Sequence, residues 1–251
     1  MSSHINSTHF INGAVSGAVG VVISHPFDTI KTSIQNGNKI RLSPSALYYG
    51  IFPAVIGIGI EKAIVFGTYN NTNNILKEHK IPSYLANPLS GAISGLISSL
   101  TITPTDRLKI LAQSGKKIRL TDLAPTRLYR GLSATFTRET PGFSIYFTLY
   151  NSMKNTHIEK YSDFPLYISF LYGGLSGGAS WFGIYPQDVI KTRMQTNTEK
   201  GKISFVQTAK QIYLEGGVKS FFKGFHFALL RAVPLHSGTF MMMEIMQKYN
   251  K

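Results

Sequence analysis

The same pattern of glycine, proline and charged residues occurs three times along the 251-residue chain. Each copy has a glycine pair spaced as G-x-x-x-G inside an apolar run, then a proline, an aspartate, a lysine and a glutamine at fixed offsets. The copies centre on Pro26, Pro104 and Pro186, which are 78 and 82 residues apart. This period predicts three structural units of one design. The units cover residues 6–79, 84–157 and 165–249.

Each unit contains two segments that are long enough to cross a bilayer as an α-helix. The glycine pairs favour close helix packing in lipid, and the interspersed polar residues must face one another or a watery cavity. We therefore predict an all-α membrane protein with six transmembrane helices, arranged as three tandem two-helix repeats with pseudo-three-fold symmetry around a central cavity. A soluble helical repeat protein explains neither the segment lengths nor the glycine pairs. The predicted spans are Phe10–Gln35, Ile51–Leu76, Leu85–Gln113, Leu132–Lys154, Tyr167–Gln195 and Phe225–Gln247.

Basic residues are concentrated at one end of the predicted helices. The chain has 26 lysines and arginines against 12 acids, a net charge of +14. Of the basic residues, 17 lie in the three long connections and the helix ends that lead into them, and six lie on the opposite side. This asymmetry predicts that the long connections face the negative side of the membrane. Nucleic-acid binding is disfavoured because the charge forms no patch interleaved with aromatic residues.

The sequence lacks the usual motifs of an enzyme. It has no cysteine, and therefore neither a disulfide nor a thiolate metal site. It also has no nucleotide-binding glycine loop, nucleophile elbow or zinc-ligand spacing. We expect a protein without catalytic activity, metal or cofactor.

The three proline-centred motifs resemble the P-x-[DE]-x-x-[KR] signature of the mitochondrial carrier family. They are Pro26-Phe-Asp-Thr-Ile-Lys31, Pro104-Thr-Asp-Arg-Leu-Lys109 and Pro186-Gln-Asp-Val-Ile-Lys191. The resemblance covers the whole chain. It implies an alternating-access exchanger of the inner mitochondrial membrane, acting as a monomer on a small-molecule substrate.

The second half of the family signature, an aromatic-[KR]-G triplet, begins two of the three even-numbered helices. It occurs as Tyr129-Arg130-Gly131 and Phe222-Lys223-Gly224, whereas the first repeat has Tyr48-Tyr49-Gly50. The resemblance implies that Arg130, Gly131, Lys223 and Gly224 bind lipid head groups, with cardiolipin as the expected lipid.

The repeated charges fall on one face of each odd-numbered helix, because offsets of two, five and nine residues from proline lie within about 60° of each other. Three acids and three bases in a ring can pair between helices. By resemblance to the family, the pairs close the matrix end of the cavity, and a glutamine one turn beyond each lysine braces them. The pairs are Asp28–Lys109, Asp106–Lys191 and Asp188–Lys31, and the glutamines are Gln35, Gln113 and Gln195.

The opposite, cytoplasmic gate carries fewer charges. The family pattern [FY]-[DE]-x-x-[KR] falls here on Asn70, Asn73, Asn151, Lys154, Glu244 and Gln247. Only Lys154 and Glu244 keep a charge, so at most one ion pair can form. Amide hydrogen bonds must supply the rest, at about 1 kcal/mol each. This weakness predicts a transporter that rests open to the intermembrane space.

Substrate contacts are expected where the three repeats differ, since a small solute has no three-fold axis. Alignment of the even-numbered helices places two arginines, two glutamates and one glycine in the middle of the cavity. These residues are Gly57, Glu61, Arg138, Glu139 and Arg231. Arginine suits a carboxylate through two parallel hydrogen bonds, and a poorly solvated glutamate needs a cation. That cation is either the substrate's ammonium or a neighbouring Arg138, Arg231 or Lys62.

The segments 50–66 and 129–142 resemble ornithine and basic amino acid carriers. A cationic amino acid fits best, with Arg138 or Arg231 on its carboxylate, Glu61 on its distal ammonium and Glu139 on its α-ammonium. An acylcarnitine or another zwitterion is an alternative. A nucleotide is a further alternative, which the net positive charge of the chain favours. A membrane interaction module without transport is disfavoured by the intact matrix-gate residues.

Overall fold

The computed structural model describes residues 7–35, 43–48, 51–113, 125, 129, 132–196 and 205–249. Six long helices account for most of this part of the chain, which confirms the predicted all-α fold with six long helices. They are α1 Thr8–Gln35, α3 Ile51–Glu78, α4 Ser83–Gln113, α6 Leu132–Tyr161, α7 Leu166–Thr196 and α9 Phe225–Tyr249. Five match the predicted spans within two residues at either end. Helix α6 is longer because polar residues after Lys154 continue it beyond its apolar part.

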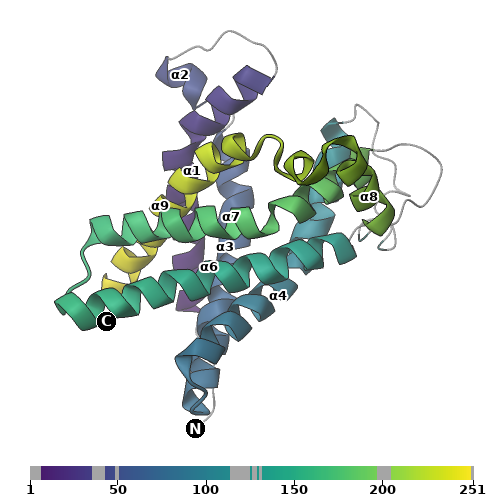
Figure 1. Ribbon diagram of the computed structural model, residues 1–251. Coiled ribbons are helices and arrows are strands. Elements are labelled where there is room, and N and C mark those ends of the chain that lie inside the picture. The colour runs from purple at the N-terminus through teal and green to yellow at the C-terminus, as the bar shows by residue number, and fades with distance from the viewer. Residues whose placement is uncertain are drawn as a thin grey trace.

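The six helices form a closed ring. Each packs on the next in chain order, and α9 packs back on α1. Figure 1 shows that the helices are strongly tilted relative to one another. By length and mean hydropathy alone, Thr8–Ile30 and Ser83–Thr105 are apolar enough to span a membrane. The other long helices are more polar.

The connections at the matrix end differ in length. The first contains the one-turn helix α2, Pro44–Leu47, whose Leu47 carbonyl accepts a hydrogen bond of 2.7 Å from Thr29 on α1. The third contains α8, Phe205–Gly216, and the 3-10 helix η2, Gly217–Phe222, at the edge of the bundle (Figure 1). Most of the second lies outside the described residues.

The glycine pair of each repeat lies where its helix crosses the other helix of that repeat. A Cβ built on Gly91 or Gly95 of α4 would lie 2.6 or 2.5 Å from the backbone oxygen of Phe143 or Glu139 on α6. Only glycine therefore permits this approach of the two backbones. In the other repeats, Gly13 and Gly17 pack against Lys62, and Gly173 and Gly177 pack against His236.

The core of the ring is an aromatic cluster from the middle and C-terminal parts of α3, α6 and α9. Phe66, Phe147 and Phe240, one from each helix, make edge-to-face contacts with centroids 5.2, 5.7 and 6.3 Å apart. Tyr69 stacks on Phe147 at 3.7 Å, and Tyr150 stacks on Phe240 at 3.5 Å. These five residues, called the aromatic plug below, join three helices that are not neighbours in the ring. They therefore fill the inside of the ring toward the end to which the sequence assigns the cytoplasmic gate.

Replacing Gly95 with alanine is expected to destabilise the protein. The added methyl group requires α4 and α6 to separate, and overpacking of this kind costs about 1–3 kcal/mol. Gly178→Ala is the control, because its Cβ would lie 3.6 Å from Leu229 and Val233, an ordinary contact distance. Thermal unfolding in detergent should show a lower midpoint for Gly95→Ala. Equal midpoints would contradict the close packing.

Replacing Phe147 with alanine is expected to loosen the cytoplasmic end. The change removes the ring that stacks on Tyr69 and touches Phe66 and Phe240, and such truncations in a packed core cost about 3–5 kcal/mol. Proteoliposomes loaded with labelled substrate should lose it several-fold faster into substrate-free medium. Phe170→Ala, at a side chain of α7 that is 38% exposed, should behave as wild type. The plug has no gating role if the two variants leak equally.

Candidate functional site

The two arginines that the sequence predicts in the middle of the cavity each hold an aspartate of the repeated motif. Arg138 Nη1 of α6 donates to Asp188 Oδ1 of α7 over 2.7 Å. Arg231 Nε of α9 lies 3.0 Å from Asp28 Oδ1 of α1. Both pairs join adjacent repeats, and all four side chains are between 17 and 36% exposed. The sequence analysis pairs these aspartates with lysines and assigns the arginines to the substrate. It therefore predicts neither of these two contacts.

Arg138 lies between two carboxylates. Besides Asp188, it forms an ion pair with the adjacent Glu139, whose side chain is nearly buried. A guanidinium presents five donors in a planar fork and can hold a carboxylate through two of them. A substrate carboxylate could thus replace Asp188 at Arg138 without changing the chemistry of the contact.

Glu61 forms an ion pair with the residue that follows it. Lys62 Nζ lies 3.2 Å from Glu61 Oε1, as in the alternative that the sequence left open for the acids. Gly57, one helical turn before Glu61, is exposed, and a Cβ built on it would meet no atom within 4 Å. This part of α3 therefore combines a charged pair with free space. Lys62 was not among the predicted site residues, although an acid–lysine pair inside an apolar run could have indicated it.

At the cytoplasmic gate, α3 and α6 are joined by amide and hydroxyl groups. Asn151 Nδ2 donates to the Tyr69 hydroxyl over 3.0 Å. The Tyr69 hydroxyl donates to Asn87 Oδ1 over 3.1 Å, and Asn73 Nδ2 donates to the same oxygen over 3.0 Å. The nitrogen of Asn70 is buried without a hydrogen bond among the described residues.

The ion pair of this gate joins α6 to α9. Lys154 Nζ lies 2.5 Å from Glu244 Oε1, and the Tyr150 hydroxyl donates to the same oxygen over 2.9 Å. Gln247 lies one turn further along α9 and is half-buried. One ion pair, braced by a tyrosine, therefore takes the place of the full charged ring that the family pattern implies.

In this conformation the cytoplasmic gate is closed, whereas a carrier that rests open to the intermembrane space stays a prediction. That prediction counted charges and amides at the cytoplasmic gate. The aromatic plug lies next to them and closes this end through stacking and edge-to-face contacts, which are worth about 0.5–1.5 kcal/mol per pair beyond the burial of their area. Closure here depends on apolar packing more than on ion pairs.

The matrix gate is described only in part. Lys191 of α7 is 5% exposed, and the carboxylates of Asp28 and Asp188 are the arginine partners described above. The side chains of Lys31, Asp106, Lys109 and the three glutamines, like Arg130 and Gly131, lie outside the described residues. The three lysine–aspartate pairs, with the glutamine braces, therefore stay predictions.

The start of α9 carries one of the two complete aromatic-[KR]-G triplets. Gly224 has φ +83°, a left-handed conformation that favours glycine. The Tyr185 hydroxyl of α7 donates to the Lys223 carbonyl over 2.9 Å, and the Lys223 side chain is exposed. This arrangement holds the first turn of α9 against α7.

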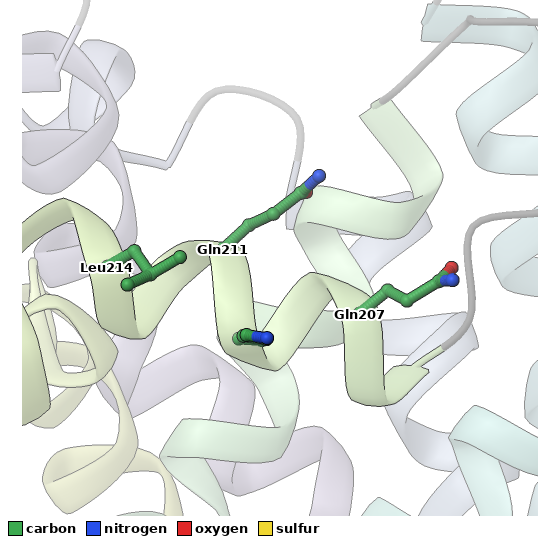
Figure 2. A pocket seen from close by; sticks show the side chains of 4 residues that line it. Gln207, Gln211 and Leu214 are labelled. Carbon is green, nitrogen blue, oxygen red and sulfur yellow. The ribbon is translucent and has the colours of Figure 1, made fainter.

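A surface hollow on α8 lies apart from these residues. It is lined by Gln207, Lys210, Gln211 and Leu214, all from one helix. Figure 2 shows three of these side chains, labelled, along α8. None of them is a predicted site residue. In the part of the chain that the structure describes, no group of three or more His, Asp or Glu residues is arranged to hold a metal ion.

Exchanging the charges of one predicted matrix pair tests the gate. Asp106→Asn should impair exchange of every substrate alike, because it strands Lys191 in the ring, and removing one partner of a buried pair costs about 3–5 kcal/mol. The double variant Asp106→Lys with Lys191→Asp should recover more exchange than either single change, measured in proteoliposomes. A double variant no better than the singles would mean that these two residues do not pair.

Comparison with known proteins agrees with this architecture. A family model described as mitochondrial carrier protein matches residues 3–45, 82–161 and 162–251. The mitochondrial carnitine carrier of Saccharomyces cerevisiae is 29% identical, over 96% of this chain and 86% of that protein. A mitochondrial glycine transporter of the same yeast is also 29% identical, over 93% and 88%. Its mitochondrial ornithine transporter 1 is 30% identical, over 93% and 92%.

The three matched stretches cover most of the chain, and the relatives align along nearly their whole length. The closed ring of six long helices and the recurring proline motif agree with this match. The chain belongs to the mitochondrial carrier family and is a multi-pass transporter of the inner mitochondrial membrane.

Proposed function

We propose that this carrier exchanges a cationic amino acid of the ornithine, lysine or arginine type by alternating access. The substrate is a small molecule with a carboxylate at one end and a cationic group at the other. It crosses the membrane chemically unchanged, without a cofactor. The observation that carries this proposal is that both arginines in the cavity are already engaged by carboxylates, those of Asp188 and Asp28.

The carboxylate end of the substrate is assigned to the arginines. Arg138 and Arg231 are 17 and 36% exposed, so each can be reached from the cavity. A substrate carboxylate competes with the aspartate that each arginine holds. The displaced Asp188 or Asp28 then shifts toward the lysines with which the family pattern pairs it in the matrix ring. Substrate binding thus promotes closure of the matrix gate, which is the coupling that alternating access needs.

The cationic end is assigned to the acids. Glu61 is 30% exposed and lies one helical turn from Gly57, where an added Cβ would meet no atom within 4 Å. Glu139 adjoins Arg138, so it can take the α-ammonium of an amino acid whose carboxylate lies on that arginine. The site thus offers one acid for each of two cationic groups. This favours a substrate with two cationic groups over a substrate with one.

The relatives support this class of substrate. Their printed names refer to carnitine, glycine and ornithine. These three molecules differ in size, but each carries a carboxylate and a cationic nitrogen. Carnitine or an acylcarnitine is accordingly the second candidate for this chain. A nucleotide is less favoured, because its phosphates would meet four carboxylates beside the two arginines.

We further propose that the carrier acts as a monomer and binds cardiolipin through Arg130-Gly131 and Lys223-Gly224. Helix N-termini favour phosphate because their backbone N–H groups are unpaired. The turn at Gly224, fixed by Tyr185, supports this use of the start of α9.

The test of the function is uptake into proteoliposomes with a panel of labelled ornithine, lysine, arginine, glycine, carnitine esters and nucleotides. Dibasic amino acids should exchange fastest. Glu61→Gln should weaken their apparent affinity about tenfold to a hundredfold, since a charge-assisted contact is worth about 1.5–3 kcal/mol. Glycine and other substrates without a distal cation should change little.

Two results would contradict the proposal. Fast exchange of nucleotides without exchange of amino acids would show that the substrate is a nucleotide and not a cationic amino acid. An equal loss for all substrates in Glu61→Gln would make Glu61 a structural partner of Lys62 only. The matched control is Glu159→Gln near the exposed end of α6, which should leave the whole panel unchanged.

A further inference from the structure

Lys62 places its ammonium in a cation-binding arrangement inside the ring. Its side chain is 3% exposed, against 30% for Glu61. Nζ lies 3.2 Å from Glu61 Oε1, 5.0 Å from the ring centroid of Phe143 and 5.9 Å from that of Tyr146. Aromatic faces beside a carboxylate are well suited to bind an ammonium group. The groups around Lys62 therefore form a site that any ammonium of suitable reach could occupy.

The backbone of Lys62 is fixed, but its ammonium is at the end of a flexible stem. A Cβ built on Gly17 of α1 would lie 2.7 Å from the Lys62 Cβ and 2.8 Å from its Cγ, so the first two carbons of the stem are held at the crossing of α1 and α3. Beyond that point, the stem has several rotatable bonds. The ammonium can move away from Glu61 without any movement of α3.

The ion pairs at the other end of the site follow the same pattern. Asp188 holds Arg138 and Asp28 holds Arg231, so internal carboxylates occupy the groups assigned to the substrate's carboxylate. Lys62 is an internal ammonium on the acid assigned to the substrate's cation. Internal groups of the substrate's own chemistry thus occupy both ends of the site.

We propose that Lys62 is a tethered substitute for the substrate's distal cation, and that Glu61, Phe143 and Tyr146 form the subsite that this cation enters when Lys62 moves aside. This inference rests on the proposed function and names a specificity-determining residue for it. Competition from Lys62 lowers the affinity for dibasic substrates and favours their release. Substrates without a distal cation do not compete with Lys62.

Lys62→Met removes the internal competitor and keeps the length of the stem. In proteoliposomes, its apparent affinity for ornithine and lysine should rise about tenfold, the gain expected when a cation–π and carboxylate site becomes free. The affinity for glycine should stay within about twofold, because glycine has no distal cation that could enter the site that Lys62 leaves. Lys62→Arg keeps the cation and should resemble wild type. Glu61→Gln in the Lys62→Met background should abolish the gain.

Two outcomes would overturn the inference. A similar loss of affinity for glycine and ornithine in Lys62→Met would make Lys62 a structural partner of Glu61. An unchanged affinity for ornithine would mean that Lys62 does not compete. Should Lys62→Met melt too low in detergent to be assayed, Lys62→Gln removes the same charge and is subject to the same two criteria.

A probe without a carboxylate separates this inference from the proposed function. Millimolar butylammonium should raise the melting temperature of Lys62→Met but not of wild type or of Lys62→Met with Glu61→Gln. If no amino acid is transported and butylammonium still stabilises Lys62→Met, the proposed function fails and the subsite stands. If amino acids are transported and butylammonium has no effect on Lys62→Met, the subsite fails and the proposed function stands.

Discussion

The compensation of charge inside the ring is the constraint on which this structure depends. A charge without a counter-ion in a membrane-spanning segment is expensive, so each must be paired or face water. Here Arg138, Arg231 and Lys62 each have a carboxylate partner. Two of these pairs join neighbouring repeats, so the same contacts that compensate charge also tie the repeats together. The proposed binding site and the interfaces between repeats therefore share residues.

Close backbone packing decides what the compensated cavity can contain. The glycine pairs bring each odd-numbered helix against its partner, as Gly91 and Gly95 of α4 do against α6. This leaves the inner faces of α3, α6 and α9 near enough for Phe66, Phe147 and Phe240 to touch. An aromatic closure needs no charge complementarity. It explains how a gate with one ion pair can be shut in this conformation.

The repeat made the helices and the charged stripes predictable from sequence, because proline, glycine and charge positions recur at fixed offsets. The partners of those charges were harder to predict. Asp28 and Asp188 contact arginines on neighbouring helices, which depends on helix tilt and on the reach of long side chains. Lys62 was named in the sequence analysis as a possible counter-ion of a glutamate, but not as a site residue. Phe147 and Phe240 were missed because an apolar face in a membrane helix can point to lipid or to the cavity, and the pattern alone does not distinguish them.

The internal ion pairs also affect the free energy of the transport cycle. A cavity with unpaired arginines and acids would hold any complementary substrate too tightly to release it. Binding the substrate equally tightly in every state of the cycle does not speed transport. Internal partners reduce the net gain from each contact to the difference between two similar ion pairs. Under the proposed function, the substrate then gains affinity mainly where it binds better than the partner that it displaces. If Asp28 and Asp188 also form the predicted pairs with the matrix lysines, recognition and gating use the same carboxylates, and no separate element between them is needed.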